Sequence, residues 1–173
     1  MVKGKVIFLN GVTSTGKTTI SKCIQDIADE NYYHMSCDMF QQMISNKFLS
    51  INYWEYLSEG TFLMYKTAKM MSDNGINVII DGMLLEMPEF KNKYNKSNYE
   101  LMKSILDDSN LFIVEVYCPL DECRKRNMIR GDRNENQSIE QNELIAKNFP
   151  YNIIVNTQNS SAIDCAKNIL TEI

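Results

Sequence analysis

The residues whose types and spacing point most directly to chemistry lie near the start of the chain, in the sequence GVTSTGKT at residues 11–18. This sequence matches the phosphate-binding pattern G-x-x-x-x-G-K-[ST]. Its glycines allow successive backbone N–H groups to face phosphate oxygens, and a following helix adds the partial positive charge of its N-terminus. In such loops the lysine, here Lys17, reaches the β- and γ-phosphates, and the hydroxyl, here of Thr18, can bind Mg²⁺. The alternative is an ordinary glycine turn that begins a helix.

Two aspartates are candidates for the remaining chemistry, because each follows an apolar, strand-like segment. Phosphoryl transfer to an alcohol requires a group that orients the hydroxyl and accepts its proton, and we assign this role to Asp38. The metal requires an acidic partner, and Asp81, which follows the residues NVII, is the candidate metal-binding residue beside Thr18. As alternatives, Asp38 could cap a helix and Asp81 could belong to an Asp-Gly turn.

All four arginines of the chain fall within the sequence RKRNMIRGDR, although lysine is the basic residue used elsewhere. Arginine makes planar, bidentate contacts with phosphate that lysine cannot reproduce. We therefore expect residues from about 124 to 138 to form a lid, in which Arg126 binds the nucleotide while Arg130 and Arg133, with Lys17, stabilise the transferring phosphoryl group. A solvated helix face is the alternative. The predicted nucleotide-binding residues are Gly11, Thr13, Ser14, Thr15, Gly16, Lys17, Thr18, Thr19 and Arg126.

These residues require a scaffold that brings them together, and the hydrophobic pattern predicts one. Apolar, partly β-branched runs predict strands, and apolar residues at helical spacing predict the helices between them. This alternation indicates one α/β domain, residues 1–173, with three layers: a five-stranded parallel sheet flanked by helices. The expected strands are residues 5–9, 32–38, 77–81, 111–118 and 151–157, and the expected helices are residues 17–29, 39–48, 53–73, 88–107, 120–130, 138–148 (capped by Ser138) and 160–171.

The composition narrows the classes of function. The chain has 173 residues, of which 44% are hydrophobic, and this suffices for a folded core. Its formal net charge of −4 indicates neither nucleic acid nor an anionic membrane as a partner, and no apolar run approaches the roughly 20 residues that span a bilayer. The five scattered cysteines are expected to be free thiols of a reducing compartment. These features predict a cytoplasmic protein with a small-molecule partner, and a homo-oligomer stays among the alternatives.

A segment rich in aromatic residues and methionine, residues 39–71, allows two interpretations. It could form an adaptable apolar pocket for a small organic acceptor, or it could pack in the core. For residues 57–71 we favour the core. For Met39, Phe40 and Met43 both interpretations stay open.

Three further polar residues lie at or near predicted strand ends. His34 is expected to be an ordinary strand residue rather than a catalytic one. Asn156 and Thr157 follow the last strand, and the geometry of a parallel sheet places them near the nucleotide base.

Several motifs, in a fixed order, resemble those of the chloramphenicol phosphotransferase-like P-loop kinases. The opening VIFLNGVTSTGKT is similar to that family's phosphate loop, SCDMF to its segment with the catalytic aspartate, and NVIIDGMLL to its IIIDDVFL segment. The sequence VEVYCPLDECRKRNMIRGDR is similar to the family's strand, helix and RGDR lid. The resemblance extends over most of the chain. It implies a P-loop kinase fold, Asp38 as the catalytic base, and Mg²⁺-ATP-dependent phosphorylation of a hydroxyl group.

The chain also departs from the family pattern. Gly82 stands where the family has a second aspartate, and the segment after Asp38 is shorter than and unlike the family's chloramphenicol-binding segment. The resemblance therefore implies O-phosphorylation more firmly than it implies chloramphenicol. The acceptor could be an antibiotic such as chloramphenicol or another hydroxylated small molecule.

Two alternative functions share the phosphate loop. A nucleoside, nucleotide or sugar-nucleotide kinase has the same plan of fold, and only its acceptor differs. A GTP-dependent switch or non-catalytic nucleotide-binding regulator predicts the guanine-reading motif N-K-x-D, whereas the Asn-Lys pairs in NKFL, NKYN and NKSN lack that aspartate.

Overall fold

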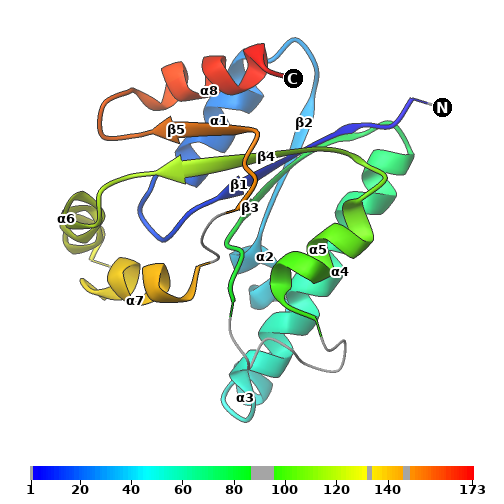
Figure 1. Ribbon diagram of the computed structural model, residues 1–173. Helices are drawn as coiled ribbons and strands as arrows, with labels where there is room; N and C mark the ends of the chain where they lie inside the picture. Colours follow the sequence, from blue (N-terminus) through cyan, green and yellow to red (C-terminus); the bar gives the residue numbers. More distant parts are fainter. Residues whose placement is uncertain (1, 87–95, 132–133, 146–148) are drawn as a thin grey trace.

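The computed structural model describes residues 2–86, 96–131, 134–145 and 149–173 (Figure 1). Arg133, predicted to act in phosphoryl transfer, lies outside these residues. The strands are β1 (Lys5–Asn10), β2 (Tyr32–Ser36), β3 (Asn77–Gly82), β4 (Asn110–Tyr117) and β5 (Ile153–Asn156). The helices are α1 (Lys17–Ile27), α2 (Cys37–Gln42), α3 (Asn46–Leu49), α4 (Tyr53–Asp73), α5 (Asn98–Leu106), α6 (Leu120–Arg130), α7 (Gln137–Leu144) and α8 (Ala162–Thr171).

A five-stranded parallel sheet forms the centre of the structure, with the strand order β2-β3-β1-β4-β5. β1 lies in the middle, and its residues 6–9 are completely buried. Strands that are covered on both faces carry continuous apolar runs rather than alternating ones, which explains the sequence VIFL. The predicted α/β class with a five-stranded parallel sheet is confirmed.

The side chains of β1 alternate between two apolar cores, one on each face of the sheet. Val6 and Phe8 pack with residues of β3, α4 and α5. Ile7 and Leu9 pack on the opposite face with residues of α1, β4 and α8. Figure 1 accordingly shows α1 and α8 together on one face and α4 with α5 on the other. The sheet is therefore the middle of three layers.

The segments that carry the candidate residues meet at the carboxyl edge of the sheet. β1 leads through residues 11–16 into α1, β2 leads directly into α2, and β3 ends at Gly82. In Figure 1, α6 and α7 lie at the end toward which β4 and β5 point. Because β2 and β3 lie on one side of β1 while β4 and β5 lie on the other, this edge is where open parallel sheets bind their ligands.

Serine side chains place two helix starts differently from the sequence prediction. The Ser36 hydroxyl accepts a hydrogen bond from the Met39 N–H at 3.2 Å, so β2 ends at Ser36 and α2 follows at once. Ser45 caps a second short helix, and the single helix predicted over residues 39–48 is therefore two helices, α2 and α3. Asp38 lies in the first turn of α2, and the interpretation of Asp38 as the helix cap is wrong.

Two other predicted helix starts also differ. α5 begins at Asn98, where Ser97 and Glu100 cap each other's backbone N–H groups, and the predicted start at Pro88 lies outside the described residues. Ser138, predicted to cap a helix, is instead a buried residue within the first turn of α7. Its hydroxyl accepts a hydrogen bond from the Asn127 side chain at 3.3 Å.

Two expectations from the composition concern the cysteines and membrane insertion. All five cysteines are free thiols, as expected, and Cys118, Cys123 and Cys165 are buried. Within the described ranges, no helix has both the length and the apolar character that crossing a membrane requires.

A buried chain of hydrogen bonds links α4, α5 and the segment after β3. The Tyr65 hydroxyl donates to Asn98 Oδ1 at 2.5 Å, and Asn98 Nδ2 donates to the Met83 carbonyl at 2.9 Å. Tyr65 and Asn98 are both almost completely buried. These hydrogen bonds therefore fix the backbone segment that follows β3, next to Asp81.

We expect the substitution Tyr65→Phe to lower the free energy of unfolding by about 1–2 kcal/mol, because a buried amide oxygen of Asn98 loses its donor. Urea denaturation followed by circular dichroism measures this change. Tyr33→Phe is the control, because Tyr33 is 52% exposed on the edge strand β2 and should change stability by less than about 0.5 kcal/mol. Equal stabilities of the two variants would contradict the assigned role of the hydroxyl.

Candidate active site

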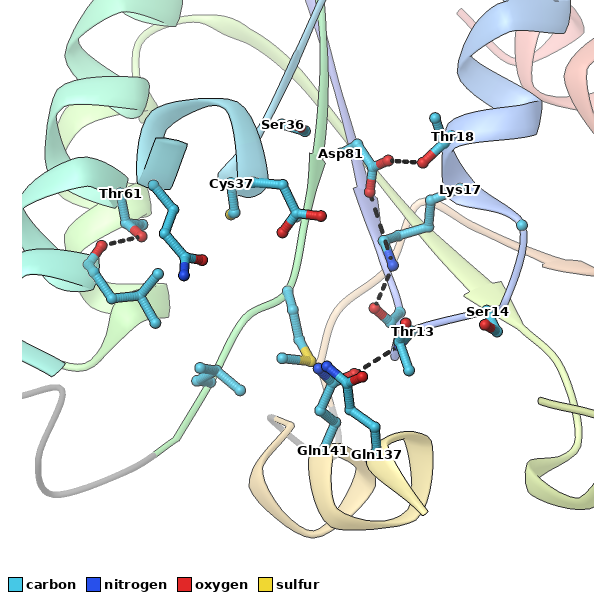
Figure 2. Close-up of a pocket in the computed structure, with 18 of the residues that line it drawn as sticks. Thr13, Ser14, Lys17, Thr18, Ser36, Cys37, Thr61, Asp81, Gln137 and Gln141 are labelled. Atoms are coloured by element: carbon cyan, nitrogen blue, oxygen red, sulfur yellow. Dashed lines mark hydrogen bonds and ion pairs between the residues drawn. The ribbon is translucent and has the colours of Figure 1, made fainter. Parts of the chain in front are cut away.

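A cavity of about 880 Å³ opens at the carboxyl edge of the sheet. One wall consists of the phosphate loop, the start of α1 and the side chains of Arg126 and Arg130. The other consists of α2, α4 and the segment after β3, and α7 closes part of the opening (Figure 2). The cavity is therefore bounded by most of the segments in which the sequence suggested functional residues.

The phosphate loop has the backbone that its sequence predicts. Gly16 has φ 99° and ψ 10°, a left-handed conformation that side chains disfavour, and it leads directly into α1. Ser14 also has a positive φ of 61°, which is uncommon for a residue with a side chain. Its hydroxyl donates to Asn127 Oδ1 of α6 at 2.6 Å, so the strained residue is held by a buried partner. The interpretation of the loop as an ordinary glycine turn does not explain why Ser14 is held in this way.

Lys17, Thr18 and Asp81 form one connected group at the base of the cavity (Figure 2). The Thr18 hydroxyl donates to Asp81 Oδ2 at 2.6 Å, and Lys17 Nζ lies 3.8 Å from Asp81 Oδ1. Lys17 Nζ also donates to the carbonyls of Gly11 and Val12, at 2.8 and 3.0 Å. Asp81 is part of β3 and 8% exposed, so its interpretation as a turn residue is wrong.

The environment of Asp81 keeps its carboxyl group ionised. Burial by itself raises the pKa, but the neighbouring His34, Lys17 and Thr18 outweigh this effect and hold the pKa of Asp81 below its ordinary value. His34 is a residue of β2, as expected, and its Nε2 lies 3.9 Å from Asp81 Oδ2. At that distance the contact is electrostatic rather than a hydrogen bond.

Arg126 joins the phosphate loop to the segment after β5. Its guanidinium donates to the Ser14 carbonyl at 3.4 Å, to Thr157 Oγ1 at 3.1 Å and to the Thr157 carbonyl at 3.0 Å. Thr157 Oγ1 in turn donates to the Thr15 carbonyl at 2.8 Å. Arg126 and Thr157 are thus both at the phosphate loop and bond to its backbone carbonyls, whereas the position of Thr157 near the nucleotide base stays a prediction.

The other arginines of the cluster take different positions. Arg130 lines the cavity. Arg124 forms an ion pair with Glu135 at 2.9 Å, where both side chains are well exposed to solvent, and contacts of this kind contribute little to stability. Arg126 and Arg130 therefore line one cavity, which Arg124 does not, and their binding of phosphate stays a prediction.

Asp38 lines the same cavity from the first turn of α2. Tyr53, at the start of α4, is close to it: burial raises the pKa of Tyr53, a hydrogen bond with Gln41 opposes this, and the charge of Asp38 adds to it. Burial also raises the pKa of the neighbouring Cys37 thiol to about 12, so this thiol is protonated at neutral pH. Asp38 is therefore the carboxylate that α2 contributes to the cavity wall.

The aromatic and methionine-rich segment contributes less to the cavity than the sequence suggested. Met39 and Met43 are exposed, and Phe40 packs against the core between the sheet and α4. Within residues 57–71, Met64 and Tyr65 are completely buried, as the preference for the core predicts. The cavity wall contains Tyr53 of this segment, together with neutral polar side chains that the sequence analysis missed, namely Gln41, Thr61, Asn98, Gln137 and Gln141.

Only two of these missed residues left a signal in the sequence. Gln137 and Gln141 are four residues apart, so they lie on the same face of a helix, and Figure 2 shows both pointing from α7 toward the phosphate loop. The other three come from α2, α4 and α5 and carry no pattern that separates them from ordinary surface residues.

Gly82, where the family pattern has a second aspartate, is closely surrounded. A Cβ atom at this position would lie 3.0 Å from Cζ of Phe8 and 3.5 Å from Sγ of Cys37. Phe8 is completely buried, and its ring would have to shift by a few tenths of an ångström to admit a side chain at position 82.

The order of these elements and of their motifs is matched by a known family. The family model of chloramphenicol phosphotransferase-like proteins matches residues 4–173. The chain belongs to this family. A curated relative from Mycobacterium tuberculosis, named "Putative O-phosphotransferase Rv2636", is 25% identical over 157 residues, which cover 77% of this chain and 66% of the relative. The chain thus spans about two thirds of that relative's length.

Solved structures with similar folds include P-loop kinases. The APS kinase CysC of Mycobacterium tuberculosis, in complex with AMPPNP and APS, has a TM-score of 0.70 at 13% identity and covers 99% of this chain and 98% of its own. The shikimate kinase of Acinetobacter baumannii, in complex with shikimate, has a TM-score of 0.66 at 15% identity and covers 98% and 93%. Similarity at such low identity concerns the fold, and it confirms the predicted P-loop kinase fold.

The hydrogen bond between Thr18 and Asp81 can be tested through its effect on acid stability. Above its ordinary pKa of 3.8, ionised Asp81 contributes stability, and this contribution is lost as the pH falls through its lower folded pKa. Thr18→Val removes the hydrogen-bond donor to Asp81, which should lower the free energy of unfolding at pH 7 by about 1–2 kcal/mol. The loss of stability at acid pH should then begin at a higher pH than in the wild-type protein. Urea denaturation at a series of pH values between about 7 and 3 measures both effects.

Thr19→Val is the matched control, because Thr19 is the next residue of α1 and is exposed. It should change stability by less than about 0.5 kcal/mol at every pH. If both variants lose stability at the same pH as the wild-type protein, the hydroxyl does not support the Asp81 carboxylate.

Proposed function

We propose that this protein transfers the γ-phosphoryl group of ATP to a hydroxyl group of a small molecule. The observation that carries the proposal is that the phosphate loop and Asp38 line one and the same cavity. A loop that binds a triphosphate and a separate carboxylate that can accept a proton are the two requirements of such a transfer. Membership of the chloramphenicol phosphotransferase-like family and the kinase fold support a phosphate-transferring enzyme.

The phosphate loop would bind the nucleotide. Its backbone N–H groups and the N-terminus of α1 attract phosphate oxygens, and Lys17 would exchange its present contacts with the loop carbonyls for the β- and γ-phosphates. The predicted contacts of Gly11, Thr13, Ser14, Thr15, Gly16, Thr18 and Thr19 belong to this step. Arg126, which already bonds the loop, would hold its shape and contribute charge near the phosphates.

Thr18 and Asp81 are suited to hold Mg²⁺. Both supply oxygen atoms, which hard divalent cations prefer, and Asp81 is ionised and buried beside Lys17. When bound, Mg²⁺ neutralises charge on the nucleotide phosphates. The two side chains would orient the nucleotide for transfer, and the hydrogen bond from Thr18 would keep the Asp81 carboxylate at a fixed distance from the loop.

Asp38 would orient the acceptor and accept the proton of its hydroxyl group. The acceptor oxygen forms a bond to the γ-phosphorus while the bond from phosphorus to the oxygen shared with ADP breaks, and ADP leaves with that electron pair. Arg130, together with Arg133, would stabilise the charge on the transferring group. Closure of residues 124–138 as a lid would exclude water and limit ATP hydrolysis.

The acceptor would occupy the part of the cavity between α2, α4 and the segment after β3. This wall presents Gln41, Tyr53 and Thr61 as hydrogen-bonding groups and Leu57 and Met83 as apolar surface. A hydroxylated organic molecule of mixed polarity fits such a wall. Antibiotics such as chloramphenicol belong to this class, and they are therefore part of the panel that tests the proposal.

The proposal predicts acceptor-dependent ADP release. Mg-ATP is incubated with hydroxylated antibiotics, nucleosides and sugars, and ADP and the phosphorylated product are measured. Asp38→Asn should lower the rate with the active acceptor by roughly 100-fold or more, because it removes the proton acceptor, and should change ATP affinity by less than about twofold. Asp26→Asn, on the exposed side of α1, is the control. Near-normal turnover by Asp38→Asn would exclude Asp38 as the base, and ATP binding without turnover on any acceptor would favour a nucleotide-binding regulator.

The metal-binding role predicts a specific loss in Asp81→Asn. The wild-type protein should bind ATP more tightly with Mg²⁺ than in EDTA, whereas the variant should lose roughly tenfold or more of this enhancement. In EDTA the variant should bind ATP at least as tightly as the wild type, because a negative charge beside the phosphates is removed. Isothermal titration calorimetry under both conditions measures this. An unchanged effect of Mg²⁺ in the variant would exclude Asp81 from metal binding.

A further inference from the structure

The side chain of Gln141 occupies a donor of the phosphate loop. Gln141 Oε1 accepts a hydrogen bond from the Thr13 backbone N–H at 2.7 Å (Figure 2). Backbone N–H groups of this loop are the groups that face phosphate oxygens when a nucleotide is bound. A side chain of α7 therefore takes the place of a phosphate oxygen at this position.

The position of Lys17 indicates which phosphate that is. Its Nζ atom lies within hydrogen-bond distance of the carbonyls of Gly11 and Val12, the two residues before Thr13. In phosphate loops the lysine reaches the β- and γ-phosphates, whereas the helix N-terminus lies at the other end of the loop. Thr13 is thus at the end of the loop where Lys17 Nζ lies, and its N–H is expected to meet the terminal phosphate group rather than the α-phosphate.

The helix that carries Gln141 is also joined to the acceptor side of the cavity. The Leu144 carbonyl at the end of α7 accepts from the Glu86 N–H at 2.7 Å, and Ile145 forms an antiparallel bridge with Leu85. Leu85 packs with Leu144 and with Leu57 of α4, and Leu57 lines the acceptor part of the cavity. One short helix therefore contacts both the phosphate loop and the acceptor wall.

A terminal phosphate would be a stronger partner for the Thr13 N–H than Gln141 is. Hydrogen bonds to an anionic oxygen are roughly twice as strong as those to a neutral one. A carboxamide is neutral, so it satisfies the N–H in the absence of nucleotide without placing a negative charge beside the loop. It can therefore be displaced by a phosphate group more readily than a carboxylate could be.

We propose that Gln141 is a positioning residue that senses the terminal phosphate of the nucleotide. ATP displaces Gln141 from the Thr13 N–H, whereas ADP, which lacks that phosphate, leaves the bond in place. Displacement frees α7 from the phosphate loop while its contacts with Leu85 and Glu86 persist, so the triphosphate state is transmitted to the acceptor wall. This proposal rests on the proposed function in requiring that ATP binds at the phosphate loop.

The proposal predicts opposite effects for two substitutions of the same residue. Gln141→Ala removes the competitor and should tighten ATP binding by roughly three- to tenfold, the equivalent of one hydrogen bond, while ADP affinity changes by less than about twofold. Gln141→Glu keeps an acceptor for the N–H and adds a negative charge, so it should weaken ATP binding more than ADP binding. Isothermal titration calorimetry with Mg-ATP and Mg-ADP gives the ratio of the two affinities for each variant.

A control separates this effect from a change in the helix as a whole. Glu143→Ala truncates an exposed side chain of α7 and leaves the bond between Gln141 and Thr13 intact, so the ratio of ATP to ADP affinity should stay at the wild-type value. A merely structural role of Gln141 would change both affinities equally, and that result would overturn the proposal while leaving the proposed phosphotransfer untouched. Failure of the wild-type protein to bind ATP would overturn both.

Discussion

The buried carboxylate of Asp81 is the constraint on which the arrangement of the site depends. It lies near the end of β3, which is next to the central strand β1, accepts a hydrogen bond from Thr18 and faces Lys17. A buried charge is tolerated only when partners of this kind compensate for the loss of water. The contact therefore fixes the first turn of α1 against β3, and with it the direction in which the phosphate loop opens.

Around this charged centre, neutral side chains hold distant segments together. Asn98 connects α5 to the segment after β3, Asn127 connects α6 to Ser14, and Gln141 connects α7 to Thr13. Amide groups can satisfy backbone donors and acceptors without adding charge. In a cavity suited to a polyanion, this leaves the electrostatic field to the loop, to Lys17, Arg126 and Arg130, and to the two aspartates.

The sequence was most informative where the determinants are local. The strand, the glycine loop and the helix that follows lie within residues 5–27, so the loop could be predicted with its residues in their places. The position of Asp81 followed from a general rule, because the carboxyl ends of parallel strands meet at one edge. The same rule indicated Asp38 and the family motifs agreed with it, although its exact setting in α2 depended on Ser36 rather than on the aspartate itself.

The contacts that were not predicted join residues far apart in the chain. Thr13 and Gln141 are 128 positions apart, and Ser14 and Asn127 are 113 apart. Such pairs depend on how α6 and α7 pack beyond the sheet, and a single glutamine or asparagine carries no periodic signal of its partner. The break between α2 and α3 was missed for a different reason, because the cap Ser45 lies within an otherwise helical pattern.

The close approach of Phe8 to Gly82 has an evolutionary consequence. The family pattern has an acidic residue at position 82, but here a Cβ would meet the ring of a completely buried phenylalanine at 3.0 Å. An aspartate at position 82 would require the ring to shift by a few tenths of an ångström, whereas a smaller residue at position 8 would make room but leave a void in the core that lowers stability. The effects of substitutions at positions 8 and 82 are therefore expected to be non-additive, which makes the two positions an epistatic pair.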